Sequence, residues 1–272
     1  MELGIFSRTF SGSAEDVFKK MYKHGFSYTH YNLSSAGLET MPMEMNKEEL
    51  NKIKNYSNKY SVVLHGISGT FNMIAPDKDE KQDGIKRFNT LCEIADFLDI
   101  RLISLCTGSK NPKSKWAWHE DNDLESSMDE LFETTVLILK KAKQYGVALG
   151  VEPEKSNVIN SAAKAKAYVD EFAPHLKIIM DGANLLGRED IPNMKQVMLD
   201  AFETLHEYIV QAHAKDIATK ENISFVAAGE GQLDYNTYIS LFKKYNYTGP
   251  LVLHGLSEAQ VPKSIAFLKE LI

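Results

Sequence analysis

The sequence predicts an α/β fold, a single (β/α)8 TIM barrel that spans residues 1–272. Short apolar segments alternate with longer amphipathic segments eight times along the chain. Such alternation is typical of a parallel sheet, because each helix returns the chain to the edge at which the previous strand began. The 272 residues suit one barrel of about 250 residues. An open nucleotide-binding sheet is disfavoured, because the turn at residues 6–10 has no glycine.

The first half of the chain contains four of the predicted strand–helix pairs. The segment at residues 3–6 is too short and wrongly flanked for a signal peptide, so we expect it to be the first strand. Ser13 is a candidate N-cap of the first helix, because Glu15 and Asp16 supply an acidic first turn. The other strands of this half are expected at residues 26–31, 61–66 and 101–106, and its helices at residues 13–24, 46–60, 78–98 and 126–145.

The second half of the chain repeats one pattern at the end of each predicted strand. Apolar runs end in an acid or an imidazole, and the four residues are Glu152, Asp181, His213 and His254. Pro153 ends the first of these strands, because proline cannot donate to a strand ladder. Since the carboxyl ends of barrel strands meet at one mouth, we expect the four side chains to converge. The helices between these strands are expected at residues 161–172, 191–206, 235–245 and 258–271.

Two carboxylates and two imidazoles at one mouth predict a divalent metal site. This donor set suits Mn²⁺ or Zn²⁺ best, with Fe²⁺ and Co²⁺ as alternatives, whereas Mg²⁺ prefers oxygen alone. Open coordination positions could chelate two vicinal substrate oxygens and stabilise an enediolate formed by proton abstraction. Each residue alone has a simpler interpretation: a solvated acid for Glu152, an Asx turn for Asp181, a core histidine for His213. His254 is equally compatible with metal ligation and with a structural role or a substrate contact.

Two further residues are candidates for contacts with a substrate. His65 is expected at the tip of the third strand, where ligation, substrate contact and simple packing all remain open. Trp116 lies with Trp118 and His119 in the long polar loop at residues 107–123. Long loops in compact domains are often functional, so the loop is a candidate lid in which an indole stacks on a bound substrate. The alternative is that Trp116 packs on the barrel rim.

Composition limits the classes of partner. The formal net charge of −6 argues against a nucleic-acid surface, which requires a basic face. Cys92 and Cys106 are distant in sequence and form no metal or redox motif, so we expect two free thiols in a reducing, cytoplasmic setting. No apolar run approaches the roughly 18 residues of a membrane span, so we expect no membrane partner.

Three motifs resemble one known family over essentially the whole chain. They are Gly150-Val151-Glu152-Pro153-Glu154, Met180-Asp181-Gly182-Ala183-Asn184 and His213-Ala214-Lys215-Asp216. The motifs are similar to those of the xylose-isomerase-like TIM-barrel superfamily, which includes sugar phosphate isomerases and epimerases, inosose dehydratases and endonuclease-IV-like proteins.

The resemblance implies a divalent metal held by Glu, Asp, His and Glu from strands five to eight. The first three fall on Glu152, Asp181 and His213, whereas the fourth falls on His254. In the epimerase-like members two glutamates form the acid/base pair, and only Glu152 matches. The two-glutamate mechanism therefore does not transfer intact, and His254 is predicted as a ligand or as the second acid/base.

The resemblance also implies substrate contacts for Asn184 and Lys215. Asn184 occupies a position where many relatives carry a substrate-binding histidine, and Lys215 could neutralise a substrate oxyanion or phosphate. An ion pair between Lys215 and Asp216 is the alternative. Glu154 and Glu230 are expected at the surface, and Glu258 at the start of the last helix.

We therefore expect a divalent-metal-dependent isomerase or epimerase that acts on a small sugar or polyol, phosphorylated or not. One alternative is an endonuclease-IV-like metal hydrolase, against which the eight histidines and the acidic charge argue. The other is a catalytically altered barrel that only binds a small ligand. Whether the chain forms a homo-oligomer is left open.

Overall fold

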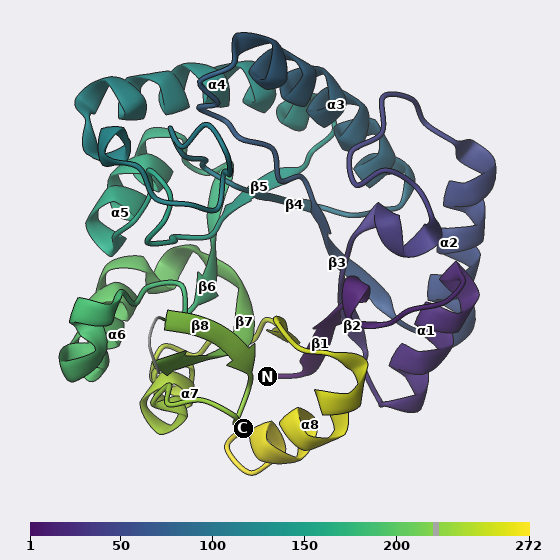
Figure 1. Cartoon of the computed structure of the whole chain (residues 1–272). Helices are drawn as coiled ribbons and strands as arrows, with labels where there is room; N and C mark the ends of the chain where they lie inside the picture. Colours follow the sequence, from purple (N-terminus) through teal and green to yellow (C-terminus); the bar gives the residue numbers. More distant parts are fainter. Residues whose placement is uncertain (220–222) are drawn as a thin grey trace.

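The structure is a computed structural model that describes residues 1–219 and 223–272. Within these residues, eight parallel strands form a closed barrel, and eight α-helices surround it (Figure 1). The prediction of a (β/α)8 barrel is confirmed. No helix in the described part of the chain combines the length and the apolar character needed to cross a membrane.

The barrel strands follow one another in chain order, and each pairs in parallel with the next. They are β1 (Leu3–Phe6), β2 (Tyr28–Tyr31), β3 (Val63–Ser68), β4 (Leu102–Leu105), β5 (Ala148–Val151), β6 (Leu176–Asp181), β7 (Ile209–Thr219) and β9 (Leu251–Leu253). The strand β9 pairs with both β7 and β1, which closes the sheet into a barrel.

The surrounding helices begin close to the predicted positions. They are α1 (Ala14–Lys23), α2 (Lys47–Tyr60), α3 (Lys78–Phe97), α4 (Glu125–Gln144), α5 (Ala162–Glu171), α6 (Met194–Leu205), α7 (Tyr235–Lys244) and α8 (Val261–Lys269). The Ser13 side chain accepts from the Asp16 N–H and forms a capping box with it, as its sequence context predicts. The helix expected from residue 191 begins later, because residues 188–193 form a 3₁₀ turn held by Asp190, which accepts from Gly187 N.

A hairpin outside the barrel was not predicted. The strand β7 continues to Thr219, and β8 (Ile223–Ala227) lies beside it (Figure 1). The two strands pair in antiparallel register, with Lys215 opposite Ala227. The sequence predicts a loop here, because the apolar run ends at residue 212. Ile217, Phe225 and Val226 favour extended structure, and cross-strand pairing extends β7 past the barrel.

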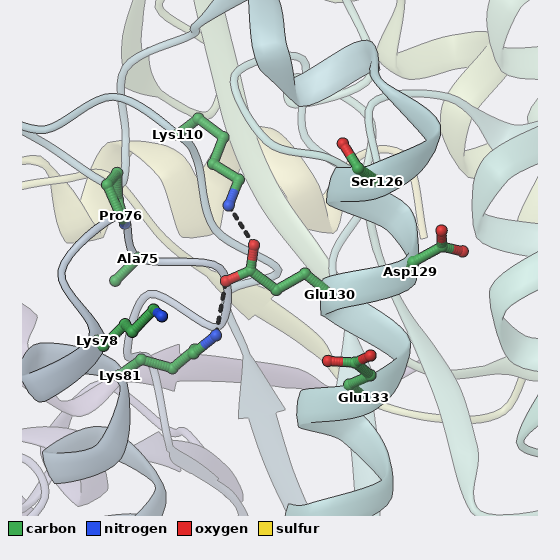
Figure 2. Close-up of a pocket in the computed structure, with 9 residues that line it drawn as sticks. All are labelled: Ala75, Pro76, Lys78, Lys81, Lys110, Ser126, Asp129, Glu130 and Glu133. Carbon is green, nitrogen blue, oxygen red and sulfur yellow. Dashed lines mark hydrogen bonds and ion pairs between the residues drawn. The ribbon is translucent and has the colours of Figure 1, made fainter.

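A polar contact outside the barrel holds one mouth loop in place. The Glu130 carboxylate of α4 lies between the ammonium groups of Lys81 on α3 and Lys110 in the loop after β4 (Figure 2). These residues line a hollow of about 400 Å³ between the two helices. The contact fixes the start of the long loop at residues 107–123 against both helices.

The two cysteines are buried free thiols, as predicted. Burial raises the pKa of Cys92, on α3, and of Cys106, directly after β4, to about 12. A thiol reacts as its thiolate, so both side chains should be inert in the folded protein.

We therefore expect neither thiol of the native protein to react with a disulfide reagent at pH 8, and both to react after unfolding in guanidinium. A spectrophotometric thiol titration measures this directly. Rapid reaction of one thiol in the native protein would contradict the buried positions of these cysteines.

Candidate metal centre

The four predicted strand-end residues lie together at the mouth of the barrel. Asp181 is the last residue of β6 and lies opposite His213 of β7 in the sheet register. His254 directly follows β9, and its backbone N–H donates to the Ala214 carbonyl at 3.2 Å. One donor atom from each of Asp181, His213 and His254 lies within 4.8 Å of the other two. Parallel pairing of β6, β7 and β9 therefore brings three ligand-type side chains to the same level.

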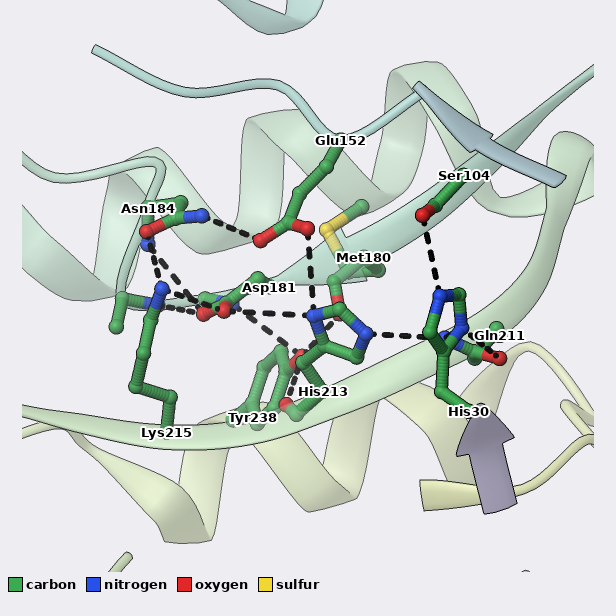
Figure 3. Close-up of polar contacts among 12 residues, drawn as sticks. His30, Ser104, Glu152, Met180, Asp181, Asn184, Gln211, His213, Lys215 and Tyr238 are labelled. Atoms are coloured by element: carbon green, nitrogen blue, oxygen red, sulfur yellow. Dashed lines mark hydrogen bonds and ion pairs between the residues drawn. The ribbon is translucent and has the colours of Figure 1, made fainter. Parts of the chain in front are cut away.

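Glu152 lies at the edge of this group of three (Figure 3). Its Oε2 is 3.4 Å from Nδ1 of His213, and its Oε1 accepts a hydrogen bond from the Asn184 side chain. The side chain remains partly exposed, whereas Asp181 and His213 are buried. Glu152 and His254 are thus the less buried members of the four, and Asp181 and His213 are the buried ones.

Three buried atoms of the group have no hydrogen-bond partner in the described structure. They are Oδ2 of Asp181 and the Nδ1 atoms of His213 and His254. Oδ2 of Asp181 is 3.0 Å from the Lys215 ammonium and 3.7 Å from His213 Nδ1. Buried polar atoms without partners are costly, and a cation between them would supply the missing interaction. One carboxylate and two imidazoles, with a second carboxylate beside them, fit a divalent transition-metal ion.

The charges at the centre set the protonation of the two imidazoles. Burial lowers the pKa of His213, but the carboxylates of Glu152 and Asp181 outweigh it and raise this pKa to about 9. Burial, with the charges of Lys215 and His213, lowers the pKa of His254 well below its ordinary value. His254 is therefore neutral, the form in which an imidazole binds a metal.

Asn184 and Lys215 belong to the same cluster of side chains. The Asn184 amide donates to Glu152, and its oxygen accepts from the Lys215 ammonium. Lys215 is almost completely buried, and its ammonium lies 3.9 Å from the centroid of the Phe225 ring on β8. The structure thus brings both predicted substrate contacts next to the metal-type residues, and Lys215 pairs with Asp181 rather than with Asp216.

Asp216 secures the segment that follows β8. Its Oδ1 accepts from Ile217 N and Leu233 N, both at 2.8 Å, and its Oδ2 accepts from Gly229 N and Gly231 N at 3.1 and 3.0 Å. The side chain is 1% exposed. Within the His-x-Lys-Asp motif, the histidine and the lysine therefore face the centre, whereas the aspartate fixes the backbone.

His65 and Trp116 are not brought into the cluster. The strand β3 continues past Gly66 to Ser68, because Ile67 and Ser68 pair with β4, so His65 is not at the tip of its strand. Its Nε2 lies 3.2 Å from the Val210 carbonyl, near the start of β7. Trp116 is half-exposed on the loop after β4, with the Lys115 ammonium 5.4 Å from its ring.

Glu154 is closer to the centre than the sequence predicts. The chain turns back after Pro153, and Glu154 N donates to the Ile159 carbonyl at 2.9 Å. Burial and the neighbouring charge of Glu152 raise the pKa of Glu154 to about 7. Its carboxyl group is thus a partly buried acid at the mouth rather than a surface charge.

Three polar residues inside the barrel were missed from the sequence. They are Gln211, His30 and Ser104, which form a line of hydrogen bonds that starts at His213 (Figure 3). One signal was available: Gln211 lies two residues before His213, and alternate residues of a strand share a face.

Fold and site together define a (β/α)8 barrel with a metal-type cluster at the carboxyl ends of its strands, the face on which such barrels carry active sites. The family model described as xylose isomerase-like TIM barrel matches residues 18–271, and the chain belongs to this family. No curated protein matches the sequence.

Several solved structures share this fold. The 3-keto-D-glucoside 4-epimerase YcjR from E. coli is 17% identical, with 99% of each chain covered and a TM-score of 0.76. The probable 3-DHS dehydratase AsbF from Bacillus anthracis is 16% identical, with 99% of this chain and 98% of that chain covered and a TM-score of 0.76. D-psicose 3-epimerase from Clostridium cellulolyticum H10 is 15% identical, with 100% and 99% covered and a TM-score of 0.73. At these identities the likeness extends to the fold, and the reaction must be argued from the site.

The anchoring role of Asp216 predicts a loss of stability on substitution. Asp216→Asn replaces one acceptor oxygen by an NH₂ group, so two buried N–H groups lose their partner. We expect the free energy of unfolding in urea to fall by about 2–4 kcal/mol. Asp129→Asn, on the exposed face of α4, is the matched control and should change it by less than about 0.5 kcal/mol. Equal changes in the free energy of unfolding of the two variants would contradict the anchoring role of Asp216.

Proposed function

We propose that this protein is a divalent-metal-dependent isomerase or epimerase that acts on a small sugar or polyol through an enediolate. The observation that carries the proposal is the set of buried ligand atoms of Asp181, His213 and His254 that make no hydrogen bond in the described structure, with the Glu152 carboxylate beside them. The neighbouring structures named as sugar epimerases support this class of substrate.

The metal would be held by Asp181, His213, His254 and Glu152, and Mn²⁺ or Zn²⁺ suits this donor set better than Mg²⁺. A bound cation of this kind would polarise a substrate carbonyl and stabilise the negative charge that develops on its oxygen.

Glu152 is the proposed base that removes a proton from the carbon next to the carbonyl. One of its oxygens is held by Asn184, which leaves the carboxylate oriented at the open side of the cluster. Asn184 would also hydrogen-bond a sugar hydroxyl. Lys215 would add a buried positive charge to that of the metal ion, and this charge would favour binding of an anionic substrate oxygen or a phosphate.

Epimerisation would also need a second proton-transfer group on the opposite face of the reacting carbon. His254 is neutral and stacks on His213 with a centroid distance of 5.1 Å, so it is available as a ligand or as this acid/base. Trp116 would contact the sugar from the loop after β4. His65 would influence substrate binding only indirectly, because its side chain contacts the Val210 carbonyl near the start of β7.

The proposal predicts metal-dependent hydrogen exchange. Protein stripped with a chelator and reloaded with Mn²⁺ or Zn²⁺ should incorporate solvent deuterium next to the carbonyl of at least one ketose in a panel of free and phosphorylated sugars, followed by mass spectrometry. Glu152→Gln should lower the rate by about 10²–10⁴-fold, the usual contribution of a general base. Glu189→Gln, an exposed acid near the rim, is the control and should leave the rate unchanged.

The outcomes separate the three functional classes. A wild type that binds no divalent ion after reloading contradicts the metal site. Metal binding without exchange on any sugar favours a barrel that only binds ligand. Metal-dependent cleavage of abasic-site DNA would support the endonuclease-IV-like alternative.

A substitution at His254 distinguishes its two proposed roles. If His254 is a ligand, His254→Gln should weaken divalent-ion affinity by about 10–100-fold, measured by competition with a chromophoric chelator. If His254 only transfers a proton, the affinity should stay within a few-fold of wild type while deuterium exchange falls. Unchanged affinity and unchanged exchange would exclude both roles.

A further inference from the structure

A line of buried polar side chains runs across the barrel interior from His213 (Figure 3). The amide nitrogen of Gln211 lies 2.9 Å from Nε2 of His213 and 3.0 Å from Nδ1 of His30. Nε2 of His30 lies 3.1 Å from the Ser104 hydroxyl. The Nε2 atom of His213 is the ring nitrogen that points away from Asp181 and Glu152, since Nδ1 is the atom near both carboxylates.

Within residues 1–219 and 223–272, the side chains of Gln211, His30 and Ser104 hydrogen-bond to one another and to His213. Gln211, His30 and Ser104 come from β7, β2 and β4, and their exposures are 0%, 1% and 7%. The strand β3 contributes Gly66 at this level, and a Cβ atom there would lie 2.9 Å from His30 Nδ1 and 3.3 Å from the Gln211 side-chain oxygen. The barrel thus keeps one position free of a side chain, which makes room for this pair.

When Nδ1 of His213 binds a cation, its Nε2 carries the proton and needs an acceptor, which Gln211 supplies if its amide oxygen faces the two imidazoles. A half-turn of the amide exchanges its oxygen and nitrogen without moving any other atom, and the two have nearly the same shape. The oxygen then accepts from His213 Nε2–H and from His30 Nδ1–H, and His30 Nε2 accepts from Ser104. An imidazole that binds a metal donates its other N–H in this way. With Nε2–H held by Gln211, the proton that His213 gives up on binding a cation is the one on Nδ1, the ring nitrogen that faces the cluster.

We propose that Gln211, supported by His30, is the positioning residue that orients His213 and keeps its proton on Nε2, so that Nδ1 can bind the metal. The proposal rests on the metal site of the proposed function and adds two residues that do not contact metal or substrate. It assigns Gln211 the role of hydrogen-bond acceptor.

Three variants test this assignment through metal affinity rather than activity. Gln211→Met keeps the length of the side chain but removes the acceptor, and it should weaken Mn²⁺ or Zn²⁺ binding by about 10–100-fold. Gln211→Glu restores an acceptor oxygen and should bind the ion within a few-fold of wild type. Thr29→Val is the control, because Thr29 is the buried neighbour of His30 on β2 but its hydroxyl donates to the Ile5 carbonyl and not to the line of residues from His213.

The readouts are chelator competition, the visible absorption spectrum of the Co²⁺-loaded protein, and circular dichroism of the metal-free variants. The Co²⁺ spectrum should change in Gln211→Met and return to that of wild type in Gln211→Glu. If Gln211→Met does not fold, His30→Met tests the same line one residue further from His213 and should weaken binding in the same direction.

Two results would overturn the proposal. One is wild-type affinity in Gln211→Met, or in His30→Met if that variant replaces it. The other is a loss of metal affinity in Gln211→Glu as large as that in Gln211→Met. Such a loss would show that Gln211 does not act as a hydrogen-bond acceptor. Failure of the wild type to bind any divalent ion would instead contradict the proposed function, so the two failures are distinguishable.

Discussion

The parallel pairing of β7 with β6 on one side and β9 on the other is the constraint on which the site depends. It sets Asp181 opposite His213 and brings His254 to the end of the adjacent strand. The Tyr238 hydroxyl of α7 reinforces this arrangement, because it lies 2.9 Å from the Met180 carbonyl and 3.0 Å from the His213 carbonyl. A shift of one residue between these strands would turn the ligand-type side chains to opposite faces of the sheet.

Charge compensation explains how so many ionisable groups can be buried together. Asp181 is fully buried, and its carboxylate contacts the Lys215 ammonium and the His213 ring. Burial opposes ionisation of Asp181, but these positive groups keep its pKa below the ordinary value. Removal of one partner from a buried ion pair typically costs about 3–5 kcal/mol, so the cluster is a constraint on stability as well as on chemistry.

The sequence predicts those features that local patterns determine. Apolar runs of strand length end in Glu152, Asp181, His213 and His254, and the rule that barrel strands share one mouth is enough to group them. The prediction that His65 lies at the tip of its strand was wrong. Where a strand ends depends on pairing with its neighbour, and β3 pairs with β4 beyond Gly66. The β7–β8 hairpin was missed although its strands are close in sequence, because its alternation of apolar and polar residues is weak. The contact of Gln211 with His30 joins residues distant in sequence, which no local pattern encodes.

Gly66 has a consequence for how this barrel can diverge. A side chain at this position would crowd the His30 ring and the Gln211 amide, although Gly66 is not one of the metal-type residues. A larger residue becomes acceptable only after one of those two side chains has shortened. The order of substitutions therefore matters, and the interior of β3 constrains the evolutionary paths open to the opposite wall of the barrel.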